Sequence, residues 1–266
     1  MSEPHPPGEA PDTAPIEVTY YTDPLCAWSW AFEPQWRRLR YEFGSQVRWR
    51  YRMGGLIPSW EAFTDPLNDV SRPIQLGPLW VQVRHTSGMP LDDRLWFADP
   101  PASSYPACLA VKAAGLQSPW AAELYLRRTR EAVMTDARNI ARRDVLEALA
   151  DEVAGASPGV LDPERLRRDL DGEEARAAFR DDLMEARYRR IERFPALTVR
   201  RGERGVVLVG YRPYPALLDA LLRVAPDVPR RQVPDAQAYA AYWGSVLPAE
   251  LAEALKGQAT PPQPAC

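Results

Sequence analysis

The sequence predicts an α/β fold in which a long helical segment interrupts a small sheet. Short runs rich in β-branched and aromatic residues lie near both ends of the chain, at 16–21, 47–53 and 196–209. Between about Asp65 and Glu192, helix start and stop signals recur instead. The 266 residues, 45% of them hydrophobic, can bury a substantial core in one domain or in one domain with a large insertion.

The first part of the chain reads as strand, helix, strand. Residues 16–21 form the first predicted strand, and residues 28–43 carry apolar side chains at roughly helical spacing. From Val47 to Met53 apolar residues alternate strictly with Arg48, Arg50 and Arg52. A strand with one arginine face suits a sheet edge, because charge there discourages pairing with another chain.

The middle of the chain predicts four or more helices. Helix starts are expected after short polar residues that often cap helices, and glycines are plausible stops. The predicted starts follow Ser104, Ser118, Asn139 and Asp162, and the predicted stops are Gly155 and Gly172.

The last part of the chain predicts a β-hairpin followed by helices. The strands at 196–200 and 206–209 are joined by a segment that contains Gly202 and Gly205. Helices are expected at 213–224, 235–243 and 248–256. The proline-rich ends, residues 1–15 and 258–266, are predicted to be disordered.

Composition excludes several classes of function. A net charge of −3 argues against a nucleic-acid-binding surface. Neither a secretory signal nor an apolar run long enough to cross a membrane is visible, and three cysteines far apart suit a reducing compartment, so a cytoplasmic location is expected. With two histidines and scattered cysteines, no metal site is predicted.

Cys26 is the residue with the most distinctive chemical setting, because it lies where the first strand turns into the first helix. Unpaired backbone N–H groups and the helix dipole at such a junction favour the thiolate, which can lower a thiol pKa from about 8.5 to roughly 3.5–7.5. Thiol chemistry is therefore expected. The alternative is that Cys26 is a small buried hydrophobic residue.

Ser29 stands three residues after Cys26, where a redox-active helix start often carries a second cysteine. A serine cannot close a disulfide, but it can donate a hydrogen bond toward Cys26 or a bound sulfur. Cys108 lies in a nearly all-apolar predicted helix, which favours a buried structural thiol over a resolving partner. Cys266, in the predicted C-terminal tail, is expected to be incidental.

The order of elements, Cys26 at the first strand-to-helix junction and Phe194-Pro195 before the hairpin resemble the thioredoxin fold with a helical insertion of the DsbA-like family. The stretches 19–30, 52–56, 104–114 and 210–214 look like its cytoplasmic FrnE-like branch. The resemblance implies a thioredoxin-like core at 16–64 and 193–225 and an inserted helical domain at 65–192. The helix signals add C-terminal helices within 226–257. The resemblance also implies that the Phe194–Pro195 bond is cis and lies against Cys26.

The expected site has Cys26 and Ser29 as catalytic residues and a groove beside them that binds substrate. The residues expected to line or orient this groove are Trp28, His85, Trp96, Tyr105, Phe194 and Pro195. Each has a structural alternative. Any one of the aromatic residues could pack in the core, Pro195 could be an ordinary strand-start proline, and His85 could face solvent or cap a helix.

The main functional expectation is a cytoplasmic thiol-disulfide oxidoreductase or isomerase acting through one cysteine. Because Ser29 replaces the resolving cysteine of the family, glutathione or a substrate thiol would have to resolve the mixed disulfide. The expected partner is a thiol-containing protein or small molecule, not a nucleic acid or a membrane, with no bound cofactor. Two alternatives are a kappa-like glutathione-dependent transferase or isomerase, whose family also resembles the chain around Cys26, and a non-catalytic adaptor that holds a protein client.

Overall fold

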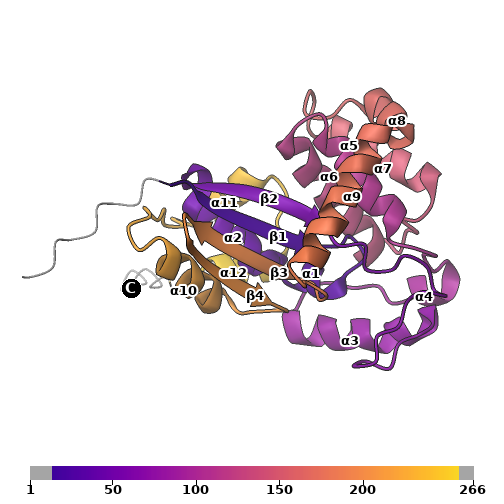
Figure 1. Ribbon diagram of the computed structural model, residues 1–266, viewed down its shortest axis with the longest axis horizontal. Coiled ribbons are helices and arrows are strands. Elements are labelled where there is room, and N and C mark those ends of the chain that lie inside the picture. The colour runs from indigo at the N-terminus through magenta and orange to yellow at the C-terminus, as the bar shows by residue number, and fades with distance from the viewer. Residues whose placement is uncertain (1–13, 258–266) are drawn as a thin grey trace, which may run out of the picture.

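The computed structural model describes residues 14–257, and a four-stranded sheet lies at its centre (Figure 1). The strand order is β2 (Val47–Met53), β1 (Ile16–Thr22), β3 (Ala196–Arg201), β4 (Arg204–Val209). β1 runs parallel to β2 and antiparallel to β3, which forms a hairpin with β4. The predicted strands are confirmed, and β2 is an edge strand as its arginine face predicts.

One face of the sheet packs on two helices that lie on either side of the helical insertion in sequence. α2 (Glu33–Phe43) and α10 (Tyr214–Val224) bury their apolar residues against Val18 and Tyr20 of β1. Because side chains alternate along a strand, Tyr21 points to the opposite face, where it packs with Ala186 and Ala196.

The opposite face is crossed by α9 (Glu173–Tyr188), as Figure 1 shows. Arg52 of β2 forms ion pairs with Asp182 at 2.6 Å and with Glu185 at 2.7 Å, and both carboxylates lie on α9. The last of the three arginines of β2 is therefore bound to this helix. Tyr21 Oη donates to Glu185 Oε1 at 2.8 Å.

The helix expected at 28–43 is in fact two helices. α1 (Ala27–Ala31) ends at Phe32, and α2 begins at Glu33 with Pro34 in its first turn. Proline has no N–H to donate to the carbonyl of Trp30, so the helical hydrogen-bond pattern is interrupted between α1 and α2. The prediction of helical structure at 28–43 is confirmed, but the prediction of one continuous helix is wrong.

Residues 65–192 form seven α-helices. These are α3 (Leu76–Ser87), α4 (Leu95–Ala98), α5 (Tyr105–Gly115), α6 (Pro119–Met134), α7 (Arg143–Ala156), α8 (Pro163–Asp171) and α9. A 3-10 helix at Pro73–Gln75 precedes α3, and another at Gly44–Gln46 lies between α2 and β2. Their buried residues form one cluster with Leu25, Trp30 and Met53, which come from outside the helical segment. α5 to α8 gather beyond one end of the sheet (Figure 1).

Most predicted helix boundaries are confirmed. Ser118 and Asp162 cap α6 and α8 with their side chains, and Gly172 ends α8. Two boundaries were wrong. Asn139 accepts from the Ala141 amide at 2.9 Å in a turn, so α7 starts only at Arg143, and it continues past Gly155 to Ala156.

The C-terminal part adds α11 (Ala236–Trp243) and α12 (Pro248–Ala254), close to the predicted ranges. α12 packs along α2, and Glu250 of α12 is fully buried. The predicted tails and Cys266 lie outside the described residues, apart from residues 14 and 15. The domain boundaries drawn from the sequence stay predictions.

Candidate functional site at the first strand-to-helix junction

Cys26 is the N-cap residue of α1, directly after β1 and a turn. Its backbone N–H donates to Asp23 O at 3.2 Å, and its side chain is 5% exposed as a free thiol. The thiol Sγ donates to Phe194 O at 3.6 Å. The Phe194–Pro195 bond is cis, and its loop lies against Cys26, as the family resemblance predicts.

The prediction that Cys26 has a lowered pKa is wrong. Burial raises the pKa of the Cys26 thiol, and the charge of Asp23 adds to this effect. The Ser29 side chain and backbone amide, together with the more distant Arg130, favour the thiolate but do not compensate. Cys26 does lie at a helix start, but α1 spans only five residues. Burial removes the solvation of the thiolate, and this effect on the pKa is larger than that of the favourable contacts.

Ser29 is fully buried beneath Cys26 on α1. Within residues 14–257 the Ser29 hydroxyl has no hydrogen-bond partner. Its position therefore allows a hydrogen bond to the sulfur without supplying a second redox group.

Asp23 is a site residue that the sequence analysis missed. Its carboxylate is fully buried and accepts from Leu25 N at 2.8 Å, Leu56 N at 2.7 Å and Ser104 Oγ at 2.8 Å. Cys108 Sγ donates to the same carboxylate at 3.2 Å, which explains why Cys108 is a buried free thiol, as predicted. Burial raises the pKa of Asp23, opposed by these hydrogen bonds. The Asp-Pro pair at a strand end is the only sequence signal for it.

Two glycines after β2 let aromatic rings approach the site closely. A Cβ atom on Gly54 would lie 1.9 Å from Phe194 Cζ, and one on Gly55, at φ +62°, would lie 2.7 Å from Tyr105 Cε1. Phe194 and Tyr105 are both half-buried. They therefore form neighbouring walls beside the Cys26 turn.

The other predicted groove residues are spread more widely. Trp28 is half-buried on α1, with its ring centroid 5.7 Å from that of Tyr211. Trp96 is 2% exposed and packs edge-on against Trp80 at 5.1 Å, which is core packing. His85 is exposed on α3. The structure brings Cys26, Ser29, Phe194 and Pro195 together, places Trp28 and Tyr105 beside them, and buries Trp96 in the helical core.

Among residues 14–257 no group of three or more His, Cys, Asp or Glu side chains is placed to hold a metal ion. The same stretch of chain contains no helix that is long and apolar enough to span a bilayer.

The family model that describes thioredoxin matches residues 20–218, which include the junction, the cis proline and the whole helical insertion. The chain belongs to the thioredoxin family. This family member is 30% identical over 223 residues to the ClpXP adapter protein SpxH of Halalkalibacterium halodurans, covering 83% of this chain and 71% of that protein. It is 29% identical to the SpxH of Bacillus subtilis, covering 90% and 77%.

Among solved structures, the cytosolic disulfide reductase DsbM of Pseudomonas aeruginosa superposes with a TM-score of 0.59 and 25% identity, covering 78% of this chain and 98% of that one. The resemblance to DsbA-like thioredoxin folds is thereby confirmed.

The expectation of a thiol-disulfide oxidoreductase or isomerase is wrong. The relatives that match 83–90% of the chain at 29–30% identity are ClpXP adapter proteins. The buried, protonated thiol of Cys26 and the serine at position 29 give the physical reason. The junction that suggested redox chemistry is a feature of the fold that catalytic and non-catalytic members can share.

Proposed function

We propose that this protein is a non-catalytic thioredoxin-fold adapter that binds a protein client and presents it to a ClpXP-type protease. The observation that carries the proposal is the similarity to ClpXP adapter proteins over 83–90% of the chain. We propose a cytoplasmic location, because two free buried cysteines suit a reducing compartment.

The thiol of Cys26 supports binding without catalysis. A buried thiol with a raised pKa is a poor nucleophile, because the thiolate is the attacking species in disulfide exchange. In this account Cys26 has a positioning role: its hydrogen bond to Phe194 O holds the cis-proline loop against α1.

We propose that the client binds beside Cys26 against Trp28, Tyr105, Phe194 and Pro195, and we call this proposed binding region the client cleft. Three of these are half-buried aromatic residues, a residue class that is enriched at protein interfaces. The backbone N–H groups of Arg193 and Phe194 donate no hydrogen bond within residues 14–257. An extended client segment could accept from these N–H groups and pack its side chains on the aromatic walls.

A reconstituted degradation assay tests the proposal. The client is first identified as the protein that co-purifies in stoichiometric amount with the tagged chain from its own cells. ClpXP from the same cells should then degrade the purified client at least about tenfold faster when the chain is present, because tethering raises the effective concentration of the client. An unchanged rate contradicts the proposal.

The client cleft has its own test. Phe194→Ala should weaken client binding by about 1–3 kcal/mol, as expected for loss of an aromatic anchor. Phe97→Ala is the matched control, because Phe97 is a 67% exposed aromatic residue on α4. Equal effects of the two variants would show that the client binds elsewhere.

A further inference from the structure

A groove of about 380 Å³ lies beside β2, the strand at one margin of the sheet (Figure 1). Residues 49–53 of β2 form one side of this groove, and the helical insertion forms the other. We call it the edge groove. None of the four residues of the client cleft lines it. Its helical side is apolar apart from Lys112, and the apolar residues are Val111, Gly115, Leu116, Pro119, Ala122 and Ala178.

The backbone of β2 has an outer side that faces away from the rest of the sheet. Gly54 N donates to Thr22 O of β1 at 2.7 Å. Because backbone groups along a strand point alternately to its two sides, the N–H of Met53 points away from β1. This N–H donates to Asp182 Oδ2 of α9 at 2.8 Å, in agreement with that direction.

Tyr51 and Trp49 share the outward direction of Met53, because they lie two and four residues before it. Their backbone N–H and C=O groups have no hydrogen-bond partner within residues 14–257, where β2 pairs only with β1. Both residues are half-buried and line the edge groove. Unpaired backbone groups of this kind are a template for a further strand.

The arginines of β2 place positive charge beside the edge groove. Arg48 and Arg50 have only Glu17 as an ion-pair partner within residues 14–257, at 3.9 Å and 3.4 Å. Their side chains are 65% and 54% exposed, and Arg50 lines the groove. Two exposed arginines therefore share one carboxylate.

The other basic residues beside the groove also share their partners. Arg52 and Lys112 both line it and share Asp182, at 2.6 Å and 2.8 Å. Arg52 and Arg189 share Glu185, at 2.7 Å and 3.0 Å. Three carboxylates thus serve five basic side chains, and no acidic residue of the described chain lines the groove. The edge groove therefore keeps a surplus of positive charge.

We propose that the edge groove binds an extended acidic segment of a partner protein, which adds to β2 as a new edge strand. The unpaired backbone groups of Trp49 and Tyr51 supply the hydrogen bonds of the added strand. Successive side chains of a strand point to opposite faces, so acidic residues beside Arg50 would alternate with apolar residues against the groove walls. This inference does not depend on the adapter function.

The arginines of β2 also determine which strands are rejected. A second copy of this chain would bring its own Arg48, Arg50 and Arg52 to the same edge, where like charges repel. The same side chains attract a strand that carries carboxylates. Charge on this edge therefore selects an acidic partner instead of blocking every partner.

Calorimetric titration of the full-length protein with a short blocked peptide that alternates glutamate and valine tests the proposal. This peptide should bind at least about tenfold more tightly than its lysine–valine counterpart. Arg50→Gln should weaken binding of the glutamate peptide about fivefold, because one charge-assisted contact is lost. Ala122→Phe should abolish binding, because its ring fills the groove.

Arg223→Gln is the matched control for the charge change, because Arg223 is 70% exposed on α10 and lies outside the groove. It should leave the affinity unchanged, and thermal unfolding of each variant establishes that it is folded.

Two N-methylated peptides test the strand pairing itself. One carries methyl groups on its valine nitrogens and the other on its glutamate nitrogens, and only one of these sets of N–H groups can face β2. One methylated peptide should therefore lose at least about tenfold in affinity, while the other binds like the parent peptide. Four results would overturn the proposal: no binding up to about 1 mM, equal affinity for the two charged peptides, equal loss for the two methylated peptides, or unchanged binding to Ala122→Phe.

Discussion

Asp23 connects the Cys26 turn to two distant parts of the chain. One carboxylate accepts from Leu56, which follows β2, and from Ser104 and Cys108 at the start of α5. A buried carboxylate is costly unless it is fully hydrogen-bonded, and here both oxygens are satisfied. Asp23 therefore fixes the position of the helical insertion relative to Cys26.

Asp23→Asn should lower the free energy of unfolding by about 1–3 kcal/mol. The amide has only one oxygen, so at least one of the N–H, O–H and S–H groups that donate to Asp23 is left facing an NH2 group. Urea unfolding measures this change. An Asp23→Asn variant as stable as wild type would mean that the hydrogen bonds to the second carboxylate oxygen do not contribute to the free energy of unfolding.

Cys26 should react slowly with iodoacetamide at pH 7, at least about tenfold more slowly than glutathione in the same tube, because burial keeps the thiol protonated. Site-specific labelling followed by mass spectrometry separates Cys26 from Cys108 and Cys266. Rapid labelling of Cys26 at pH 6 would contradict the raised pKa.

The same raised pKa fixes the sign of a stability change with pH. The folded state holds the Cys26 proton more tightly than the unfolded state, so this stabilisation is fully present below the unfolded pKa of about 8.5. It is lost as the pH rises through the higher folded pKa. Wild type should therefore lose stability relative to Cys26→Ser above about pH 8.5, as measured by urea unfolding across this range.

The segment after β2 determines, through its lack of side chains, how closely two rings of the proposed client cleft approach the backbone. Gly54 and Gly55 occupy the positions where the rings of Phe194 and Tyr105 approach the backbone. Any side chain at Gly54 must displace Phe194, which is held by the loop that contacts Cys26. The arrangement of the cleft therefore depends on a segment distant in sequence from both rings.

Gly54→Ala should lower the free energy of unfolding by about 1–3 kcal/mol and weaken client binding, because the new methyl group overlaps the Phe194 ring. Gly205→Ala in β4 is the matched control, since its Cβ would meet its nearest atom at 3.5 Å, and it should change stability by less than about 0.5 kcal/mol. Equal effects of the two variants would argue against a steric cause.

Local patterns in the sequence predicted the elements better than the site. The alternation of Val47 to Met53 predicted both the strand and its place at the sheet edge. The position of Cys26 was also predictable, but its pKa was not, because burial of the sulfur depends on packing against the Phe194 loop. Asp23 was missed for the same reason, since its partners come from segments that only the tertiary fold brings together.

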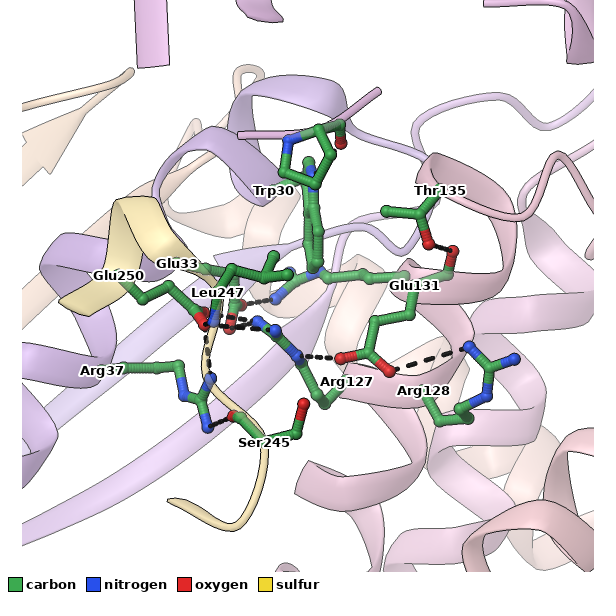
Figure 2. A network of polar contacts seen from close by, with 12 residues as sticks. Trp30, Glu33, Arg37, Arg127, Arg128, Glu131, Thr135, Ser245, Leu247 and Glu250 are labelled. Carbon is green, nitrogen blue, oxygen red and sulfur yellow. Dashed lines mark hydrogen bonds and ion pairs between the residues drawn. The ribbon is translucent and has the colours of Figure 1, made fainter. Parts of the chain in front are cut away.

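At the scale of the whole molecule, Glu250 on α12 forms ion pairs with residues of two other parts of the fold. Its buried carboxylate binds Arg37 of α2 and Arg127 of α6, so one side chain links the C-terminal helices, the sheet layer and the helical insertion (Figure 2). The two arginines lower the pKa of Glu250 against the opposing effect of burial. This carboxylate is therefore ionised in the folded state at neutral pH.

Glu250→Gln should lower the free energy of unfolding by about 3–5 kcal/mol, because it leaves two buried arginines short of one negative charge. The pKa of Glu250 is lower when folded, so its stabilisation is present above the unfolded value of about 4.3 and is lost as pH falls through the folded value. The gap between wild type and Glu250→Gln in urea unfolding should thus narrow toward low pH.

Glu173→Gln provides the control for this network. Glu173 is an exposed partner of Arg180 on α9, and surface ion pairs contribute about 0–1 kcal/mol. A loss of stability as large as that of Glu250→Gln would show that burial of the network is not the cause.

The most direct test of the account compares the rate at which ClpXP degrades the purified client with wild-type protein and with Cys26→Ser. Serine keeps a small hydroxyl donor for Phe194 O and removes all sulfur chemistry. The account predicts that both proteins accelerate degradation to within about twofold of each other, a difference of roughly 0.4 kcal/mol. Loss of the acceleration in Cys26→Ser would show that the thiol itself acts on the client and would contradict a non-catalytic adapter.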